Sequence, residues 1–128
     1  MIEADPIDIA VLRRLFQNDV AAMRKFSYRF VELANETLSD MKSAQADRNS
    51  AELGRLGHKL KATARTVGAL SFADLCESLE TVRSNHEWRV VEAAMIELPV
   101  LLERITQQLD QEFESTAIPP GGSDDGCE

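Results

Sequence analysis

Residues 54–80 read GRLGHKLKATARTVGALSFADLCESLE, and the first part of this stretch has the apolar pattern of an amphipathic helix. An α-helix turns by ~100° per residue, so apolar residues spaced three or four apart lie on one side of it. This spacing relates Leu53, Leu56, Leu60, Ala64 and Val67. On the same helical wheel His58 lies roughly 140° from this apolar stripe. We therefore predict that His58, one of two histidines in the chain, points to solvent.

The residues around His58 are small or positively charged. Residues four apart lie above one another on a helix, which places Gly54 one turn before His58 and Ala62 one turn after it. Gly57 precedes the histidine, and a glycine inside a helix costs roughly 1 kcal/mol relative to alanine, so close approach by another molecule is an expected compensation. Four cations, which we call the basic collar, surround this opening: Arg55, Lys59, Lys61 and Arg65. An uncovered imidazole among cations is suited to carrying or meeting an anion.

Three short motifs in this stretch resemble those of the histidine-containing phosphotransfer (HPt) domain of multistep phosphorelays. They are His58-Lys59-Leu60-Lys61-Ala62-Thr63-Ala64, Val67-Gly68-Ala69 and Cys76-Glu77-Ser78-Leu79-Glu80. Their order and spacing resemble the family pattern, which usually has glycine in the place of Ala62.

The resemblance implies a role for each part of this surface. His58 would accept the phosphoryl group, and Lys61, one turn away, would assist electrostatically. The face that docks a receiver domain would include Gly54, Arg55, Gly57, Lys59, Ala62 and Arg65. The acceptor aspartate and Mg²⁺ would come from the partner, a response-regulator receiver domain, so the chain would need no cofactor of its own. A sensor or hybrid histidine kinase would be a further partner.

The composition favours a single soluble helical domain. The chain has 128 residues, 44% of them hydrophobic and 28% charged, with four prolines and six glycines. No apolar run approaches the ~18 residues of a membrane span, and the acidic N-terminus is unlike a signal peptide. The two cysteines, Cys76 and Cys127, do not suggest a structural disulfide, so we expect a cytoplasmic protein.

The charge is distributed unevenly along the chain. A net charge of −8 argues against nucleic acid as a partner, because phosphate binding needs a positive surface. Residues 47–68 have five cations against two acids, a net charge of +3, whereas residues 69–113 have three arginines against nine acids, a net charge of −6. This basic patch on an acidic body favours an acidic partner at the His58 face.

A short helix and a long helix are predicted before the quoted stretch. Asp5-Pro6 has the form of an N-cap followed by proline at the first helical position, and this helix would end near Gln17. Asp19 suits the N-cap of the long helix, whose apolar residues recur at intervals of three and four from Met23 to Ala44.

Gly68 is suited to end the helix of His58 in a left-handed conformation. Ser71 and Asp74 resemble a capping box for the next helix, which Ser84-Asn85 would end.

The last predicted helix begins near Glu87 and contains Pro99. An interior proline costs ~3 kcal/mol or more, but the apolar register continues through it, so we expect a kink rather than a break. Residues 114–128 contain Pro-Pro, Gly-Gly and four acids, which predicts a disordered acidic tail.

These patterns predict an all-α protein. Residues 1–113 would form an antiparallel up-down four-helix bundle with a short N-terminal capping helix. The HPt resemblance implies the same fold. One bundle accounts for the apolar stripes, so we expect a monomer.

The residues exclude two other classes of bundle protein. A di-metal bundle would use Glu-x-x-His pairs, whereas Arg55 and Arg83 stand three residues before the two histidines. There is no Gly-rich phosphate loop, so we expect no autonomous ATP-dependent kinase activity.

Imidazole suits phosphoryl exchange because much of it is neutral, and hence nucleophilic, near neutral pH. We therefore expect a phosphocarrier that accepts a phosphoryl group on His58 from a receiver-domain aspartate and passes it to another receiver domain. The alternative is a non-catalytic helical adaptor that binds a receiver or kinase domain without phosphotransfer.

Overall fold

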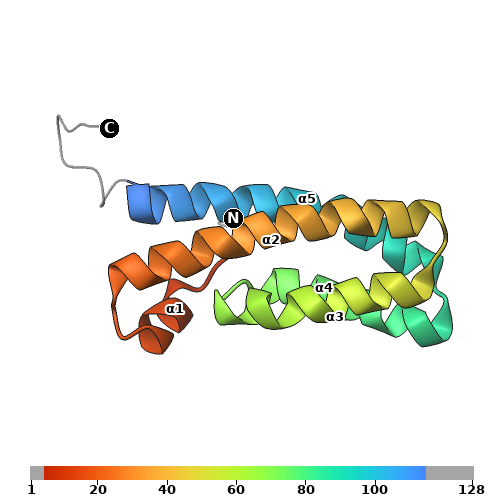
Figure 1. Ribbon diagram of the computed structural model, residues 1–128, viewed down its shortest axis with the longest axis horizontal. Coiled ribbons are helices and arrows are strands. Elements are labelled where there is room, and N and C mark those ends of the chain that lie inside the picture. The colour runs from red at the N-terminus through yellow and green to blue at the C-terminus, as the bar shows by residue number, and fades with distance from the viewer. Residues whose placement is uncertain (1–4, 115–128) are drawn as a thin grey trace.

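The computed structural model describes residues 5–114, which form helices joined by short turns (Figure 1). No strand occurs within this range, which confirms the all-α prediction. The helices in this range are α1 Ile9–Leu15, α2 Val20–Ala46, α3 Ser50–Thr66, α4 Leu70–Asn85, α5 Trp88–Leu109 and the π-helix η1 Asp110–Glu114. None of these helices is long and apolar enough to span a membrane.

The four long helices surround one hydrophobic core. α3 packs against α2 and α4, and α5 packs against the same two helices, so the four form a closed ring (Figure 1). Phe30 of α2 and Phe72 of α4 meet inside this ring, with their ring centroids 5.6 Å apart in an edge-to-face arrangement. Leu60 of α3 and Leu98 of α5 are fully buried in the same core. Burial of such apolar side chains is the main stabilising term of the fold.

Side chains and glycine define several helix ends, of which those at Asp19 and Gly68 are as predicted. Asp19 caps α2 by accepting the N–H of Ala22 at 3.1 Å, and Asn49 caps α3 by accepting the N–H of Glu52 at 3.0 Å. A cap of this kind contributes about 1 kcal/mol. Gly68, after α3, has a φ of +85°, the left-handed conformation that the sequence predicts for it.

The predicted start of α1 is wrong. The helix begins at Ile9, and Asp8 rather than Asp5 is its N-cap. The residues before it do not continue the helix because Ile7 is buried in the core, at 2% exposure. Ile7 donates its N–H to Oε1 of Gln108 at 2.9 Å, and its carbonyl accepts from Nε2 of the same side chain at 3.0 Å. This contact with the end of α5 takes the place of helical hydrogen bonds.

The capping box predicted for α4 is also wrong. α4 begins at Leu70, ahead of Ser71, and its N-cap Ala69 makes no side-chain hydrogen bond. The N–H of Ala69 donates to the carbonyl of Ala64 at 2.8 Å, so the last turn of α3 leads directly into α4. The turn therefore leaves no polar linker for Ser71 to cap. The predicted end of α4 is confirmed, since the helix stops at Asn85.

α5 continues through Pro99, which is exposed, so the proline does not break the helix. The chain then passes into η1, which ends at Glu114. The predicted disordered tail, residues 114–128, lies outside the described residues except for its first residue.

Candidate functional site

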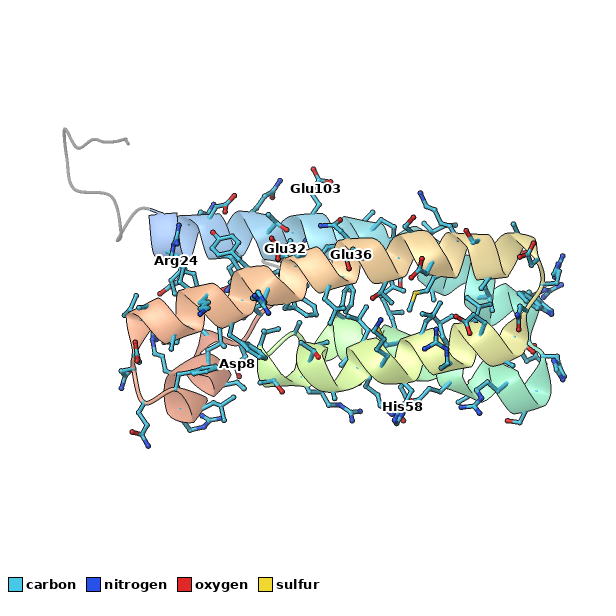
Figure 2. The ribbon with its side chains drawn as sticks, in the orientation of Figure 1. Asp8, Arg24, Glu32, Glu36, His58 and Glu103 are labelled. Atoms are coloured by element: carbon cyan, nitrogen blue, oxygen red, sulfur yellow. The ribbon has the colours of Figure 1, made fainter. Side chains whose placement is uncertain are left out.

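His58 lies in the middle of α3, on the outer side of the helix (Figure 2). Its side chain is 71% exposed, whereas Leu56 and Leu60, two residues before and after it, are fully buried. Two residues correspond to a rotation of about 200° on a helix, which places them on nearly opposite sides. The predicted exposure of His58 is confirmed.

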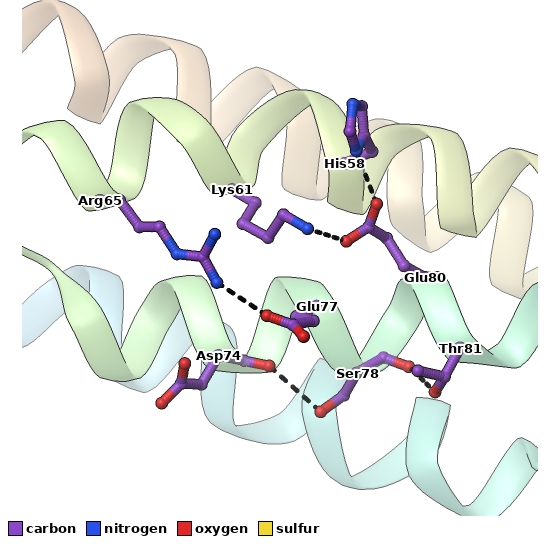
Figure 3. A network of polar contacts seen from close by, with 8 residues as sticks. All are labelled: His58, Lys61, Arg65, Asp74, Glu77, Ser78, Glu80 and Thr81. Carbon is purple, nitrogen blue, oxygen red and sulfur yellow. Dashed lines mark hydrogen bonds and ion pairs between the residues drawn. The ribbon is translucent and has the colours of Figure 1, made fainter.

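A glutamate of the neighbouring helix holds the imidazole of His58. Glu80 of α4 places Oε2 2.6 Å from Nδ1 of His58, and its other oxygen, Oε1, accepts a hydrogen bond from Nζ of Lys61 (Figure 3). The side chains of Lys61 and Glu80 are only 18% and 20% exposed. Their charges are partly shielded from water, so this pair interacts more strongly than a fully exposed one.

The carboxylate decides which nitrogen of His58 can react. The pKa of Glu80 is lowered, chiefly by the hydrogen bond from Lys61 and also by the one from His58, although burial opposes the shift. Glu80 is therefore ionised at neutral pH and has no proton to give, so Nδ1 must carry the hydrogen of this bond. In a neutral ring the lone pair is then on Nε2, which points away from Glu80 (Figure 3).

Sequence reasoning assigns no role to Glu80, although this residue ends the last motif. The distances of His58 and Glu80 from Gly68 in the sequence could have indicated this contact. His58 stands ten residues before this glycine and Glu80 twelve residues after it. Two helices that fold back on each other at a tight turn bring residues at similar distances from the turn side by side. This register points to Glu80 as the partner of His58.

The cations of the basic collar are mostly paired with acids. Arg55 donates two hydrogen bonds to Glu52, at 2.9 and 2.5 Å, and Arg65 donates one to Glu77 of α4 at 2.7 Å. Exposed pairs of this kind contribute little to stability, because water and salt screen them. Lys59 is exposed and makes no ion pair within the described part of the chain. The collar therefore presents less unpaired positive charge than the sequence indicates.

The two glycines near His58 are not on an open face. Gly54 and Gly57 are buried in the contact between α3 and α4. A Cβ on Gly57 would lie 2.5 Å from the carbonyl oxygen of Cys76, and a Cβ on Gly54 would lie 1.9 Å from Cδ of Arg83. The expected clearing for a visiting molecule is thus wrong for these two residues. Their missing side chains make room for the neighbouring helix, which brings α4 close to α3.

Ala62 is the small residue of this group that is exposed. Side chains on a helix lean toward its N-terminus, so the methyl group of Ala62 lies over the turn that contains His58. The space above the imidazole therefore depends on this position. The docking role of Ala62 and of the basic collar stays a prediction.

Comparison with known proteins identifies the family and agrees with the helical fold. The family model described as Hpt domain matches residues 28–115. Among solved structures, the chain is similar to histidine-containing phosphotransfer protein B (HptB) from Pseudomonas aeruginosa PAO1, with a TM-score of 0.80 and 20% sequence identity over 88% of this chain and 98% of that chain. At this identity the likeness shows a shared fold. No curated protein matches the chain. Because the family model matches most of the chain, including the helix that carries His58, the chain belongs to the Hpt domain family of phosphotransfer relay proteins.

Proposed function

We propose that the chain is a phosphorelay intermediate that accepts a phosphoryl group on Nε2 of His58 from the aspartate of one receiver domain and passes it to the aspartate of another. The observation that carries this proposal is the exposed imidazole whose Nδ1 is bonded to the Glu80 carboxylate. That bond leaves the nucleophilic lone pair on the nitrogen that a second protein can approach.

Each transfer exchanges one bond to phosphorus for another. The lone pair of Nε2 forms the N–P bond while the O–P bond of the aspartyl phosphate breaks, and the aspartate leaves with the electron pair as a carboxylate. The ring of His58 keeps its proton on Nδ1 and becomes positively charged, and the negative charge of Glu80 stabilises it. Transfer to the second receiver reverses these steps. The protein mainly has to supply in-line positioning and charge neutralisation.

Lys61 acts in this proposal through Glu80 as well as through its own charge. Its bond to Oε1 fixes the carboxylate and helps to keep it ionised beside His58. In this proposal the receiver domain supplies Mg²⁺. The Glu80 carboxylate, which contacts His58, is bonded through both of its oxygens. Mg²⁺ requires oxygen ligands that are free to coordinate it. The chain would need no cofactor of its own.

The proposal includes how the chain presents this site. The receiver docks on the exposed part of α3 around His58, which comprises Arg55, Lys59, Ala62 and Arg65. The closed ring of helix contacts and the short turns support an antiparallel up-down four-helix bundle, with α1 packed against α3 as a cap. One such bundle buries its own core, so we propose that a monomer in the cytoplasm performs the transfer.

Incubation with a phosphorylated receiver domain tests the proposed function. We expect phosphate on this chain that is labile in acid and stable in base, and we expect a second receiver domain to remove it. Binding of the receiver without any phosphate on the chain would instead identify the non-catalytic adaptor.

Ala62→Leu is expected to slow transfer to His58 by at least about tenfold, which requires only ~1.4 kcal/mol of lost transition-state stabilisation. The larger side chain leans over the turn of His58 and fills the space that the phosphorylated aspartate has to enter. The initial rate of transfer measures the effect, and the circular dichroism of the helices should not change. Ala93→Leu, at an exposed alanine of α5, is the matched control. A normal rate in Ala62→Leu would contradict the proposed approach path.

Glu80→Gln is expected to reduce the transfer rate by about tenfold or more, as is typical when a general base or nucleophile loses the group that orients it. The neutral amide does not stabilise the positive ring, and its NH₂ group can turn toward Nδ1 and favour the wrong tautomer. Glu77→Gln, on the same helix, removes the partner of Arg65 and serves as the control. Equal rates in the two variants would show that the Glu80 contact does not act in transfer.

A further inference from the structure

Arg83 of α4 crosses α3 at Gly54, one turn before His58. A Cβ on Gly54 would lie 1.9 Å from Cδ, 2.0 Å from Cγ and 3.1 Å from Nε of this arginine. The aliphatic part of Arg83 therefore lies directly on the backbone of α3, in the space that a side chain at position 54 would fill. Within residues 5–114, Arg83 forms no ion pair with a carboxylate.

This crossing places the side chain of Arg83 one helical turn from His58 along α3. Cβ positions four residues apart on a helix are ~5–6 Å from each other. Because side chains lean toward the N-terminus of their helix, the ring of His58 extends over the turn that contains Gly54. Nε of Arg83 lies at that same turn, 3.1 Å from a Cβ on Gly54. A separation of about one helical turn is within the reach of a guanidinium toward a group attached to Nε2.

The charges around His58 show why a further cation matters. The charge of Lys61 is matched by Glu80, and that of Arg65 by Glu77. A phosphoryl group adds nearly two negative charges at neutral pH, so it would stand next to pairs that are already neutral. Within the described residues, Lys59 and Arg83 form no ion pair with a carboxylate, and Arg83 is the one whose side chain crosses α3 one turn from His58.

We propose that Arg83 binds the phosphoryl group of phosphorylated His58, and that residue 54 is glycine because the arginine side chain has to cross α3 there. This inference rests on the proposed function of His58 as the phosphoacceptor. The planar guanidinium presents several N–H donors in a fixed fork that matches phosphoryl oxygens, which an ammonium group does not reproduce. Arg83 is thus a phosphoryl-binding residue contributed by α4.

Chemical phosphorylation of His58 tests this contact without a receiver domain. The chain, in a His86→Gln background, is treated with the small phosphoryl donor phosphoramidate, and the phosphohistidine signal is titrated by ³¹P NMR. A nearby cation favours the dianion and lowers the pKa of the phosphoryl group, so Arg83→Gln is expected to raise that pKa by about 0.3 to 1 unit. Arg83→Lys should restore part of the shift. Arg89→Gln, at an exposed arginine of α5, should leave the pKa unchanged.

Gly54→Ala provides the second arm, because its methyl group displaces the arginine side chain without removing the charge. It is expected to raise the phosphoryl pKa when Arg83 is present. It should add nothing to the effect of Arg83→Gln, since both changes act through one contact.

An unchanged pKa in Arg83→Gln would overturn the inference, while transfer from a receiver to the wild type would still support the relay. A raised pKa without transfer from any receiver would uphold the contact and overturn the relay. Absence of phosphate on His58 after treatment would overturn both.

Discussion

Replacing His58 with glutamine is expected to abolish the acid-labile, base-stable phosphate on the chain after incubation with a phosphorylated receiver domain. The amide nitrogen of glutamine has no free lone pair with which to attack phosphorus, so the loss is complete rather than partial. The side chain of His58 is 71% exposed, and glutamine is a good helix former, so α3 and the core should be unaffected. Phosphate on the intact protein, measured by mass spectrometry or radiolabel, gives the result.

His86 provides the matched control for this substitution. It follows α4 in a left-handed conformation, with a φ of 54°, and its side chain is exposed. Its Nδ1 lies 3.3 Å from Oγ of Ser50, a hydroxyl group rather than a carboxylate. His86→Gln is therefore expected to keep the full amount of phosphate. Phosphate that remains on His58→Gln but is lost from His86→Gln would assign the reaction to the other histidine and refute the proposal.

The long helices could be predicted because their signals are local or periodic. The spacing of Leu53, Leu56 and Leu60 gives the buried side of α3, and these three residues are fully buried. The cap at Asp19 needs only an N–H three residues later. The start of α1 differs because Ile7 is held by Gln108, which is 101 residues away in the sequence. No local pattern reports such a contact.

The site was predictable in part for the same reason. A helical wheel measures direction from the large apolar residues, which is sufficient to place His58 in solvent. It does not show where glycines allow a second helix to approach, since glycine has no hydrophobic signal of its own. Gly54 and Gly57 are therefore read as open from the sequence, while in the structure α4 covers them. Glu80 reaches His58 across this same contact, so its role requires the register of α4 against α3.

Gly57→Ala is expected to lower the free energy of unfolding by about 2–4 kcal/mol, a loss typical of severe overpacking in a core. The added Cβ would lie 2.5 Å from the carbonyl oxygen of Cys76 and 3.2 Å from Cβ of Leu79. The nearer obstacle is the backbone of α4, which cannot rotate away as a side chain can, so the two helices have to separate. This effect outweighs the ~1 kcal/mol that alanine gains over glycine in helix propensity. Urea denaturation followed by circular dichroism measures the change.

Gly54→Ala, three residues earlier in α3, is the control that separates close helix packing from helix propensity. Its Cβ would meet Cγ and Cδ of Arg83, a flexible side chain that can turn into solvent, so the change in stability should lie between a slight loss and a gain of about 1 kcal/mol. Equal losses in the two variants would mean that the α3–α4 contact is not specific to Gly57. Wild-type stability in Gly57→Ala would mean that the added Cβ lies farther than 2.5 Å from the carbonyl oxygen of Cys76. The two helices would then be packed less closely than the structure has them. In that case Glu80 would no longer be held within bonding distance of His58, and the argument that leaves Nε2 as the reactive nitrogen would fail with it.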